Sequence, residues 1–509
     1  MTHADAMAEN RRLREKVAQL ELDVHQLEVM LRLQRMSQFA SSSERHVATP
    51  LFPSGALAPV KADDEAKEEV KAHLRRKKKR AVIPENAVKE IVTHDLPIGE
   101  RTCPAHGVDL SRGADRMTRR VEWIPAVVKV VEHVSATYCC PICDKVVKIA
   151  EPPPSPIPGS IATPSLLAQV ATAKFADGLP LYRQEAILAR AGIELSRTTL
   201  ATWMSKVATL LTPLCNLFND LLLSSKVLFV DETHLQVLKV PGKAATSKSY
   251  LWVRVGAVDG RKIVLFHFDP TRSSEVPVAL LDGYHGFVTT DDYSGYNRIE
   301  KMPGIRRLQC WMHIRRYFKK ALKALGKHGS GGIADQALSR IRELYAIERE
   351  CASFIPGDRR RHRLEFAVPK LDAFREWLEV AHGDLPPKSA TAKAVKHALD
   401  VWDYLVVYVE DGHLLMDNGP AENAIRPVAV GRKNFLFCDS VEGAEATAVL
   451  YSIIETAKAH GFDPFAYLRL AIERLTAART IEDVEALLPW NIHDLAPIRQ
   501  PEHQNTAHS

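Results

Sequence analysis

The feature that most constrains the fold is an apolar run, Val227–Val230, that ends in the acidic pair Asp231 and Glu232. A continuous apolar run of this length is typical of a central strand buried on both faces, with its polar residues at its end. Asp291 follows another short β-prone run, and Glu422 lies just inside a predicted helix start. One such carboxylate alone is more typical of a helix cap or a loop. Three of them at element ends suit a site for two divalent metal ions, because Mg²⁺ prefers oxygen ligands.

The whole chain has the composition of a soluble globular protein. Its 509 residues predict three or four domains, and its 46% hydrophobic and 26% charged content allows each to bury a core. No apolar run is long enough to cross a bilayer, and the N-terminal residues contain no signal-peptide core, so a cytoplasmic protein is expected. The net charge of +6 is small for this length, and local runs of charge are therefore more informative than the average.

The N-terminal residues predict a coiled coil over 8–38, followed by a linker over 39–98. Leucine and valine alternate at spacings of four and three from Leu13 to Leu31, as in a coiled-coil seam that would join copies of the chain. A helix packed on its own domain would show a similar pattern. The linker mixes Pro, Ser, Ala and charge without apolar periodicity. It carries a basic arm, which is either a solvated tail or a DNA phosphate contact, made of Arg75, Arg76, Lys77, Lys78, Lys79 and Arg80.

Residues 99–150 predict a small zinc-binding module. A C-x-x-H pair and a C-x-x-C pair supply four ligands for a closed tetrahedral site: Cys103, His106, Cys140 and Cys143. Cys140 is preferred over its neighbour Cys139 because it completes the C-x-x-C spacing. The alternative is a set of unrelated reduced thiols beside a surface histidine.

Residues 160–222 predict a helical DNA-binding region. A helix begins at the Thr163 cap, a second ends at Gly192, and a third begins at Ser196 with Arg197 in its first turn. This order resembles a helix-turn-helix, in which Arg197 would contact DNA. A plain helical hairpin gives the same pattern.

From residue 223 onward the chain predicts an α/β core. Residues 223–320 form its first part, in which Asp259 and Gly260 mark the turn of a hairpin. A strand with Asp231, two antiparallel strands, a helix after Ser274 and a strand ending at Asp291 are the order of a ribonuclease-H-like core. A short fourth strand and a basic helix follow. Residues 321–412 predict a helical insertion, 413–460 the second part of the core, and 461–495 a C-terminal helical segment.

The order of these motifs resembles the large transposase of the insertion-sequence-66 family, one of the DDE transposases of bacterial mobile elements. The resemblance covers nearly the whole chain. The matching segments of the core and tail are Val230–Thr233, Thr290–Tyr296, Cys310–Arg316, Asp417–Pro427, Gly431–Asn434 and Ile454–Asn491. The chain departs from the family at His106, where Cys is usual, and at Asp292, where Gly is usual.

The resemblance implies that Asp231, Asp291 and Glu422 hold two Mg²⁺ (or Mn²⁺) ions, with Asp231 bridging both. The implied reaction is metal-dependent DNA strand cleavage and strand transfer at the terminal inverted repeats of an insertion sequence. Asp291 rather than Asp292 is the expected ligand because it occupies the matching position. Glu232 is expected to point to the opposite face of the strand and to be structural.

The resemblance also implies partners: terminal-repeat and target DNA, further copies of the chain, small accessory transposition proteins, and no membrane. The protein would be associated with the nucleoid. Basic residues near the carboxylates are expected at DNA phosphates, although a solvated helix face is the alternative for the first two: Arg315, Arg316, Arg426, Arg432 and Lys433.

Two other functions fit parts of the sequence. One is a ribonuclease-H-like nuclease that cleaves DNA without joining it. The other is a zinc-containing DNA-binding regulatory protein with an inactive core, against which the three carboxylates argue.

Overall fold

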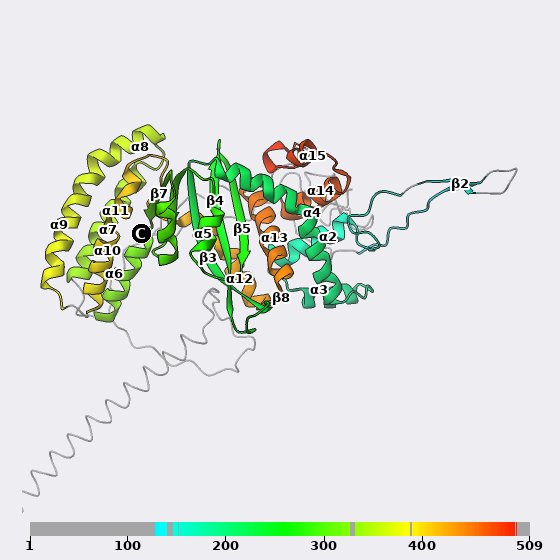
Figure 1. Cartoon of the computed structure of the whole chain (residues 1–509), viewed down its shortest axis with the longest axis horizontal. Helices are drawn as coiled ribbons and strands as arrows, with labels where there is room; N and C mark the ends of the chain where they lie inside the picture. Colours follow the sequence, from blue (N-terminus) through cyan, green and yellow to red (C-terminus); the bar gives the residue numbers. More distant parts are fainter. Residues whose placement is uncertain are drawn as a thin grey trace, which may run out of the picture. The chain divides into compact units, whose positions relative to one another are not determined.

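The computed structural model describes residues 128–139, 146–150, 152–325, 331–386, 389–493 and 495. All of them belong to one unit of the chain, Arg119–Ser509 (Figure 1). The predicted coiled coil, the linker with its basic arm, and the four zinc ligands lie outside the described residues. They stay predictions.

A mixed sheet of six strands is the centre of the described part (Figure 1). The strands are β3 (Val227–Lys239), β4 (Lys248–Val258), β5 (Arg261–Asp269), β6 (Gly286–Thr290), β7 (Ile305–Gln309) and β8 (Cys438–Ser440). Their order is β5-β4-β3-β6-β7, and β8 pairs with the far end of β3. β3, β4 and β5 are antiparallel, whereas β6 and β7 run parallel to β3. A separate antiparallel hairpin joins β1 (Thr137–Cys139) to β2 (Val146–Ile149).

Local sequence explains the central strands. The side chains of the apolar run on β3 alternate between the two faces of the sheet and are largely buried on both. The turn between β4 and β5 has φ of 51° at Asp259 and 78° at Gly260, and a two-residue hairpin turn requires such positive values. The predicted hairpin is confirmed.

A helix covers the β5 edge of the sheet. β5 is an edge strand, and α13 (Val441–Ala459) packs along it. The backbone N–H of Val264 donates to Thr456 Oγ1 (3.1 Å), and that of Phe266 donates to Ser452 Oγ (2.8 Å). Side-chain hydroxyls thus satisfy backbone groups that would otherwise invite pairing with another chain.

The helices before the sheet begin where the sequence predicts. They are α2 (Pro164–Phe175), α3 (Leu181–Arg190) and α4 (Arg197–Leu223). Thr163 caps α2 by accepting from the N–H of Leu166, and Ser196 caps α4 by accepting from the N–H of Thr199. However, α4 is 27 residues long and shares one hydrophobic core with the sheet. The three helices with the predicted helix-turn-helix order therefore belong to the same body as the sheet, here called the α/β body.

The remaining helices of the α/β body contribute to, or pack against, the same hydrophobic core as the sheet. They are α5 (Glu275–Leu280), η2 (Ser294–Lys301), α12 (Gly419–Phe435), α14 (Pro464–Ala477), α15 (Ile481–Glu485) and η6 (Pro489–Asn491). Among the described helices, none combines the length and apolar character needed to cross a membrane.

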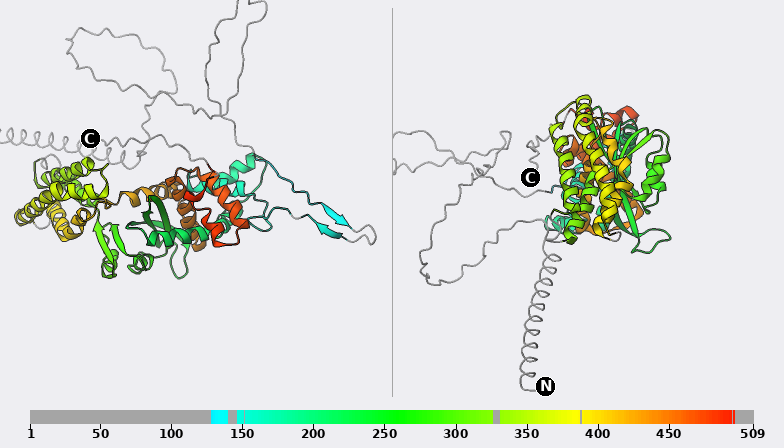
Figure 2. Two further views of the ribbon diagram at one scale, coloured as in Figure 1. Left: turned by 90° about the horizontal axis from the view of Figure 1, so that it is seen from above. Right: turned by 90° about the vertical axis from the view of Figure 1, so that its left-hand side faces the viewer.

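A second hydrophobic core lies beside β7, at the edge of the sheet opposite β5 (Figures 1 and 2). Its helices, here called the helical body, are α6 (Trp311–Leu325), α7 (Ile333–Glu350), α8 (Pro356–His362), η4 (Arg363–Ala367), α9 (Val368–Asp384), α10 (Ala390–Asp400), α11 (Trp402–Leu405) and η5 (Val406–Val409). Trp311 contacts Phe374 and Trp402, with ring centroids 6.3 and 5.7 Å away. Its indole N–H also donates to the carbonyl of Leu405 (2.9 Å).

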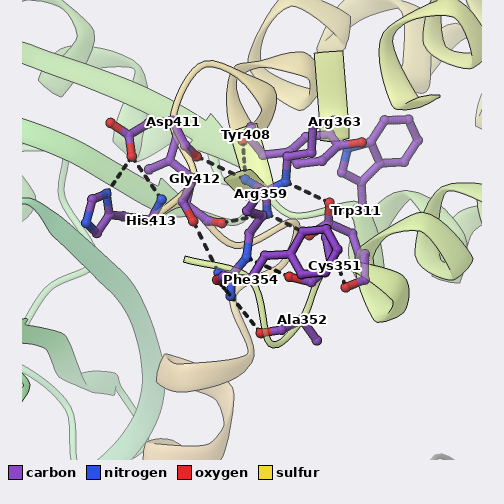
Figure 3. A network of polar contacts seen from close by, with 12 residues as sticks. Trp311, Cys351, Ala352, Phe354, Arg359, Arg363, Tyr408, Asp411, Gly412 and His413 are labelled. Carbon is purple, nitrogen blue, oxygen red and sulfur yellow. Dashed lines mark hydrogen bonds and ion pairs between the residues drawn. The ribbon is translucent and has the colours of Figure 1, made fainter. Parts of the chain in front are cut away.

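Two arginines fasten the helical body to the segment that leads back to the sheet (Figure 3). The fully buried Arg363 pairs with Glu348 at 2.6 Å and donates to the carbonyls of Tyr408 (2.7 Å) and Leu414 (2.9 Å). Arg359 donates to the carbonyl of Gly412 (3.1 Å). These arginines are structural, because their donors are already used on carbonyls and a carboxylate.

We expect Arg363→Ala to lower the free energy of unfolding of the helical body by about 3–5 kcal/mol, since it removes a fully buried side chain and leaves the partly buried Glu348 without its partner. Urea unfolding followed by tryptophan fluorescence measures this, because Trp311 and Trp402 are buried there. Arg361→Ala is the control: Arg361 is 79% exposed and pairs with Asp358, so a change under about 0.5 kcal/mol is expected. Equal effects of both substitutions would contradict the structural role of Arg363.

Candidate active site

Asp231 on β3 lies level with Asp291, which follows the neighbouring parallel strand β6. The two strands pair in a register that places Phe229 opposite Thr289, two residues before each aspartate. β3 continues to Lys239, so the expectation that this strand ends at the acidic pair is wrong. One oxygen each of Asp231, Asp291 and Glu232, here called the acidic group, lies within 4.8 Å of the others.

Asn418 positions the helix that carries the third carboxylate. Its side-chain amide donates to the carbonyl of Val230 (2.9 Å), the residue before Asp231. Its backbone N–H donates to Cys310 Sγ (3.1 Å), and its carbonyl accepts from the N–H of Glu422 (3.1 Å). Asn418 is fully buried and makes no side-chain cap bond to α12. The sequence signals only a helix start here, so this role was missed.

The charge environment links Glu422 to the other carboxylates. Burial raises the pKa of Asp231 to about 8, and the neighbouring charges of Glu232, Asp291 and Glu422 add to that effect. Desolvation and like charge both disfavour the ionised form of a carboxyl group. The three predicted carboxylates therefore share one electrostatic environment.

The expectation that Glu232 points away from this cluster is wrong. Its carboxylate lies in the acidic group, where it accepts hydrogen bonds from Arg272 (Nε, 2.6 Å) and from the hydroxyl of Tyr296. Strand alternation fixes only the direction of the Cα–Cβ bond. The longer glutamate side chain bends toward Arg272 and Tyr296, and Arg272 balances its charge.

Asp292 is held by the helical body. Its Oδ2 lies 3.1 Å from His397 Nε2 and accepts a hydrogen bond from the hydroxyl of Tyr317 at 3.1 Å. The hydrogen bond from His397 is the main cause that lowers the pKa of Asp292 to about 2. Asp291 Oδ1 instead accepts from the N–H of Tyr293 (3.0 Å) and belongs to the acidic group.

The first turns of α6 supply basic side chains beside Glu422. The guanidinium of Arg316 lies 3.7 Å from Glu422 Oε1, and His313 Nε2 lies 4.0 Å from the same oxygen. Arg315 and Arg316 are both exposed. One of the predicted DNA contacts thus stands directly beside a predicted metal ligand.

The other described basic candidates divide into two groups. Arg197, Arg426 and Lys433 are exposed. Arg432, in contrast, donates to Thr233 Oγ1 (2.7 Å) and to the carbonyl of His234 (2.6 Å). Arg432 therefore braces α12 against β3 beyond Asp231, a contact that the sequence does not signal.

The acidic group fits a hard divalent cation such as Mg²⁺ or Mn²⁺. Its donors are carboxylate oxygens, and their mutual repulsion is the kind that a bound cation relieves. Within the described part of the chain, Glu422 Oε1 is a buried atom without a hydrogen-bond partner. Such an atom is available as a ligand.

The sequence matches two family models over this region. Residues 159–446 match the family described as "Transposase IS66 family", and residues 452–490 match the "IS66 C-terminal element". The chain belongs to the IS66 transposase family. The resemblance inferred from the motifs is confirmed, and membership implies a DNA-processing enzyme that binds DNA and, as is typical of transposases, uses divalent metal ions.

Two other proteins are similar to this chain over most of their length. The chain is 31% identical over 452 residues to "Uncharacterized protein y4jD" of Sinorhizobium fredii. The aligned region covers 86% of this chain and 87% of that protein. It is also 31% identical over 444 residues to "Uncharacterized protein y4qI" of the same organism, with 83% of this chain and 81% of that protein covered.

We expect Asp231→Asn to stabilise the metal-free protein at high pH. The pKa of Asp231 is raised to about 8 on folding, so the unfolded chain releases a proton that the folded chain keeps, and stability falls as pH rises from about 4 to about 8. Removing the charge should gain about 1–3 kcal/mol above that range and nothing below it. Thermal unfolding in EDTA across this pH range measures the difference.

Mg²⁺ should raise the unfolding temperature of the parent protein and have much less effect on Asp231→Asn. The exposed Asp282 provides a control, since Asp282→Asn should leave both dependences unchanged. Identical pH and Mg²⁺ profiles for the parent and Asp231→Asn would contradict the shared environment.

We expect Asn418→Ala to weaken Mn²⁺ binding about 10-fold or more, because loss of its bond to Val230 frees the start of α12. Electron paramagnetic resonance of free Mn²⁺ measures the affinity. The exposed Asn423, the residue directly after Glu422, is the matched control, and Asn423→Ala should bind Mn²⁺ as the parent does. Unchanged binding in Asn418→Ala would remove Asn418 from this role.

Proposed function

We propose that the protein is a DDE transposase that cleaves and transfers DNA strands at the terminal inverted repeats of an insertion sequence. Asp231, Asp291 and Glu422 would hold two Mg²⁺ or Mn²⁺ ions. One observation supports this proposal: Asp231 on β3 and Asp291 after β6 lie in the acidic group, and the charge of Glu422 adds to the effect that raises the pKa of Asp231. Asn418 ties the helix that carries Glu422 to the same central strand.

The topology supports a ribonuclease-H-like core for this reaction. Three antiparallel strands continue into two parallel ones, with the acidic residues on the first strand and after the fourth. In this proposal residues 223–320 and 413–460 form the catalytic core, residues 321–412 are an insertion that contributes most of the helical body, and residues 461–495 are a C-terminal segment. Residues 160–222 pack on the core and would guide DNA through the exposed start of α4.

The residues of the chain would act by binding and positioning. Asp231 would bridge both ions, while Asp291 and Glu422 would each complete one. Bound divalent ions supply Lewis acidity for an attacking water or 3′-hydroxyl and positive charge for the leaving 3′-oxygen. The protein forms no covalent bond to DNA in this scheme. Its contribution is the prearranged site, in which the strands and Asn418 hold the carboxylates before substrate arrives.

Basic side chains near the carboxylates would hold the DNA backbone. Arg426 and Lys433 are both exposed on α12, seven residues apart. Glu422 lies in the first turn of the same helix. Arg316 stands beside Glu422 on the neighbouring helix. Lysine and arginine at phosphates give affinity without reading sequence, so recognition of the DNA ends would fall to other parts of the chain.

Other parts of the proposal concern residues outside the described ones. Cys103, His106, Cys140 and Cys143 would bind a structural Zn²⁺, and the basic arm 75–80 would contact DNA phosphates. Residues 8–38 would join copies of the chain, and small accessory transposition proteins would act with it.

We expect Asp291→Asn and Glu422→Gln each to lower Mg²⁺-dependent cleavage and joining by about 10³-fold or more, because each removes a metal ligand from the site. The substrate is DNA that carries the inverted repeats flanking the coding region, and the products are resolved on sequencing gels. Binding to the same DNA, followed by gel shift, should stay intact. Asp292→Asn is the control and should keep cleaving, since Asp292 pairs with His397 and Tyr317.

The same assay separates the alternatives. Joining by either substituted protein would refute the carboxylate assignment. Cleavage by the parent protein without joining of supplied 3′ ends would make it a nuclease. Binding with no metal-dependent nicking by the parent would make it a regulatory DNA-binding protein.

A further inference from the structure

Glu422 also belongs to a second group of possible metal-ligand atoms. Cys310 Sγ, a ring nitrogen of His313 and a carboxylate oxygen of Glu422 all lie within 4.8 Å of one another. Cys310 is the junction between β7 and α6, and His313 lies one turn later, so the C-x-x-H spacing brings thiol and imidazole to one side of a helix start. The proposed two-metal reaction uses neither Cys310 nor His313.

Two buried polar atoms in this group lack a hydrogen-bond partner among the described residues: His313 Nδ1 and Glu422 Oε1. Cys310 Sγ accepts from the N–H of Asn418, and the backbone N–H groups of Met312 and His313 also lie close to it. A buried polar atom without a partner costs free energy, and its presence in a folded protein indicates a water molecule or an ion at that place. Glu422 Oε1 is the unpartnered atom that faces His313 Nε2, so an ion between the two residues would contact it.

The donor chemistry identifies the class of ion. Sulfur, nitrogen and oxygen together suit Zn²⁺, which binds Cys, His and carboxylate ligands, whereas Mg²⁺ requires oxygen. His313 and Glu422 are 17% and 26% exposed, so an ion can enter from solvent and keep a water as its fourth ligand.

We propose that Cys310, His313 and Glu422 form a site for a thiophilic divalent cation, with Zn²⁺ as its probe, and that occupation of this site inhibits the Mg²⁺-dependent reaction. The inhibitory half rests on the proposed function of Glu422. As the sulfur–metal bond forms, the thiol proton of Cys310 passes to solvent.

The geometry requires only a small movement. Tetrahedral Zn²⁺ places its ligand atoms about 3.4–3.7 Å apart. Glu422 Oε1 lies 4.0 Å from His313 Nε2, so the carboxylate needs to turn toward α6. Arg316, which now lies 3.7 Å from the same oxygen, is half exposed and can swing into solvent.

This turn makes the two metal sites compete for one carboxylate. Glu422 bonded to Zn²⁺ has moved toward α6 and has lost the negative charge that Mg²⁺ beside Asp231 and Asp291 requires. Zn²⁺ should therefore raise the Mg²⁺ concentration needed for activity, and excess Mg²⁺ should reverse the inhibition.

The first test uses no DNA. The full-length protein is prepared with zinc, exchanged into zinc-free buffer so that only tightly bound zinc stays, and titrated with Co²⁺ while the thiolate-to-cobalt charge-transfer absorption is recorded. The parent protein should show an absorption that saturates with one equivalent and is absent in Cys310→Ser. Cys351→Ser, which changes another buried free cysteine in the helical body, should behave as the parent does.

His313→Gln provides a second variant if Cys310→Ser unfolds, and it should shift the Co²⁺ affinity by about 10-fold or more. An absorption equal in the parent and in both variants would overturn the site. Because this readout involves no turnover, it stands or falls separately from the proposed transposase activity.

The second test measures cleavage of the inverted-repeat DNA at fixed Mg²⁺ with increasing Zn²⁺. Half-inhibition of Cys310→Ser should require at least about 10-fold more Zn²⁺ than that of the parent or Cys351→Ser. Equal inhibition of all three would overturn the inhibitory role. A parent protein that does not cleave in Mg²⁺ alone would instead refute the proposed function, and the cobalt titration would then decide the site.

Discussion

The arrangement of the candidate site depends on one hydrogen bond, from the side-chain amide of Asn418 to the carbonyl of Val230. These residues are 188 positions apart in the chain, and the bond is fully buried. It sets α12 against β3 at the level where β3 delivers Asp231. Arg432 repeats the connection further along, by bonding Thr233 and His234 from the last turn of the same helix. Two contacts along one helix fix both its position and its direction, so the placement of Glu422 follows from them.

The site is held together against its own electrostatics. Burial and neighbouring carboxylates raise the pKa of Asp231 to about 8, which means that the fold tolerates a charge cluster that opposes folding. Arg272 pairs with Glu232, and among the described residues neither Asp231 nor Asp291 forms a salt bridge with an arginine or lysine. A site whose only function was stability would pair these aspartates with arginine or replace them with apolar residues. The retained repulsion is typical of a functional site, and a bound cation would relieve it.

Local sequence rules predicted much of this structure, and long-range contacts account for what they missed. The apolar run before Asp231, the turn at Asp259, and the caps Thr163 and Ser196 are decided by neighbouring residues, so the sequence predicts them directly. Asn418 looked like an ordinary residue at a helix start because its partner is 188 positions away. Glu232 was assigned to the wrong face because strand alternation describes Cβ atoms and cannot describe where Arg272 draws a carboxylate. Arg432 was expected at DNA phosphates, because local sequence gives no sign of its distant partners Thr233 and His234.

The helical body contacts the candidate site at three separate places, and this explains how a segment between the second and third carboxylates can help build the site. His397 of α10 pairs with Asp292, next to Asp291. The first turns of α6 face Glu422 through His313 and Arg316. Arg363 holds the carbonyl of Leu414, four residues before Asn418. Each contact bears on a different part of the site, so a displacement of the helical body would move Asp291 and Glu422 by different amounts. The helical body therefore helps to set the positions of Asp291 and Glu422, although it carries none of the three carboxylates.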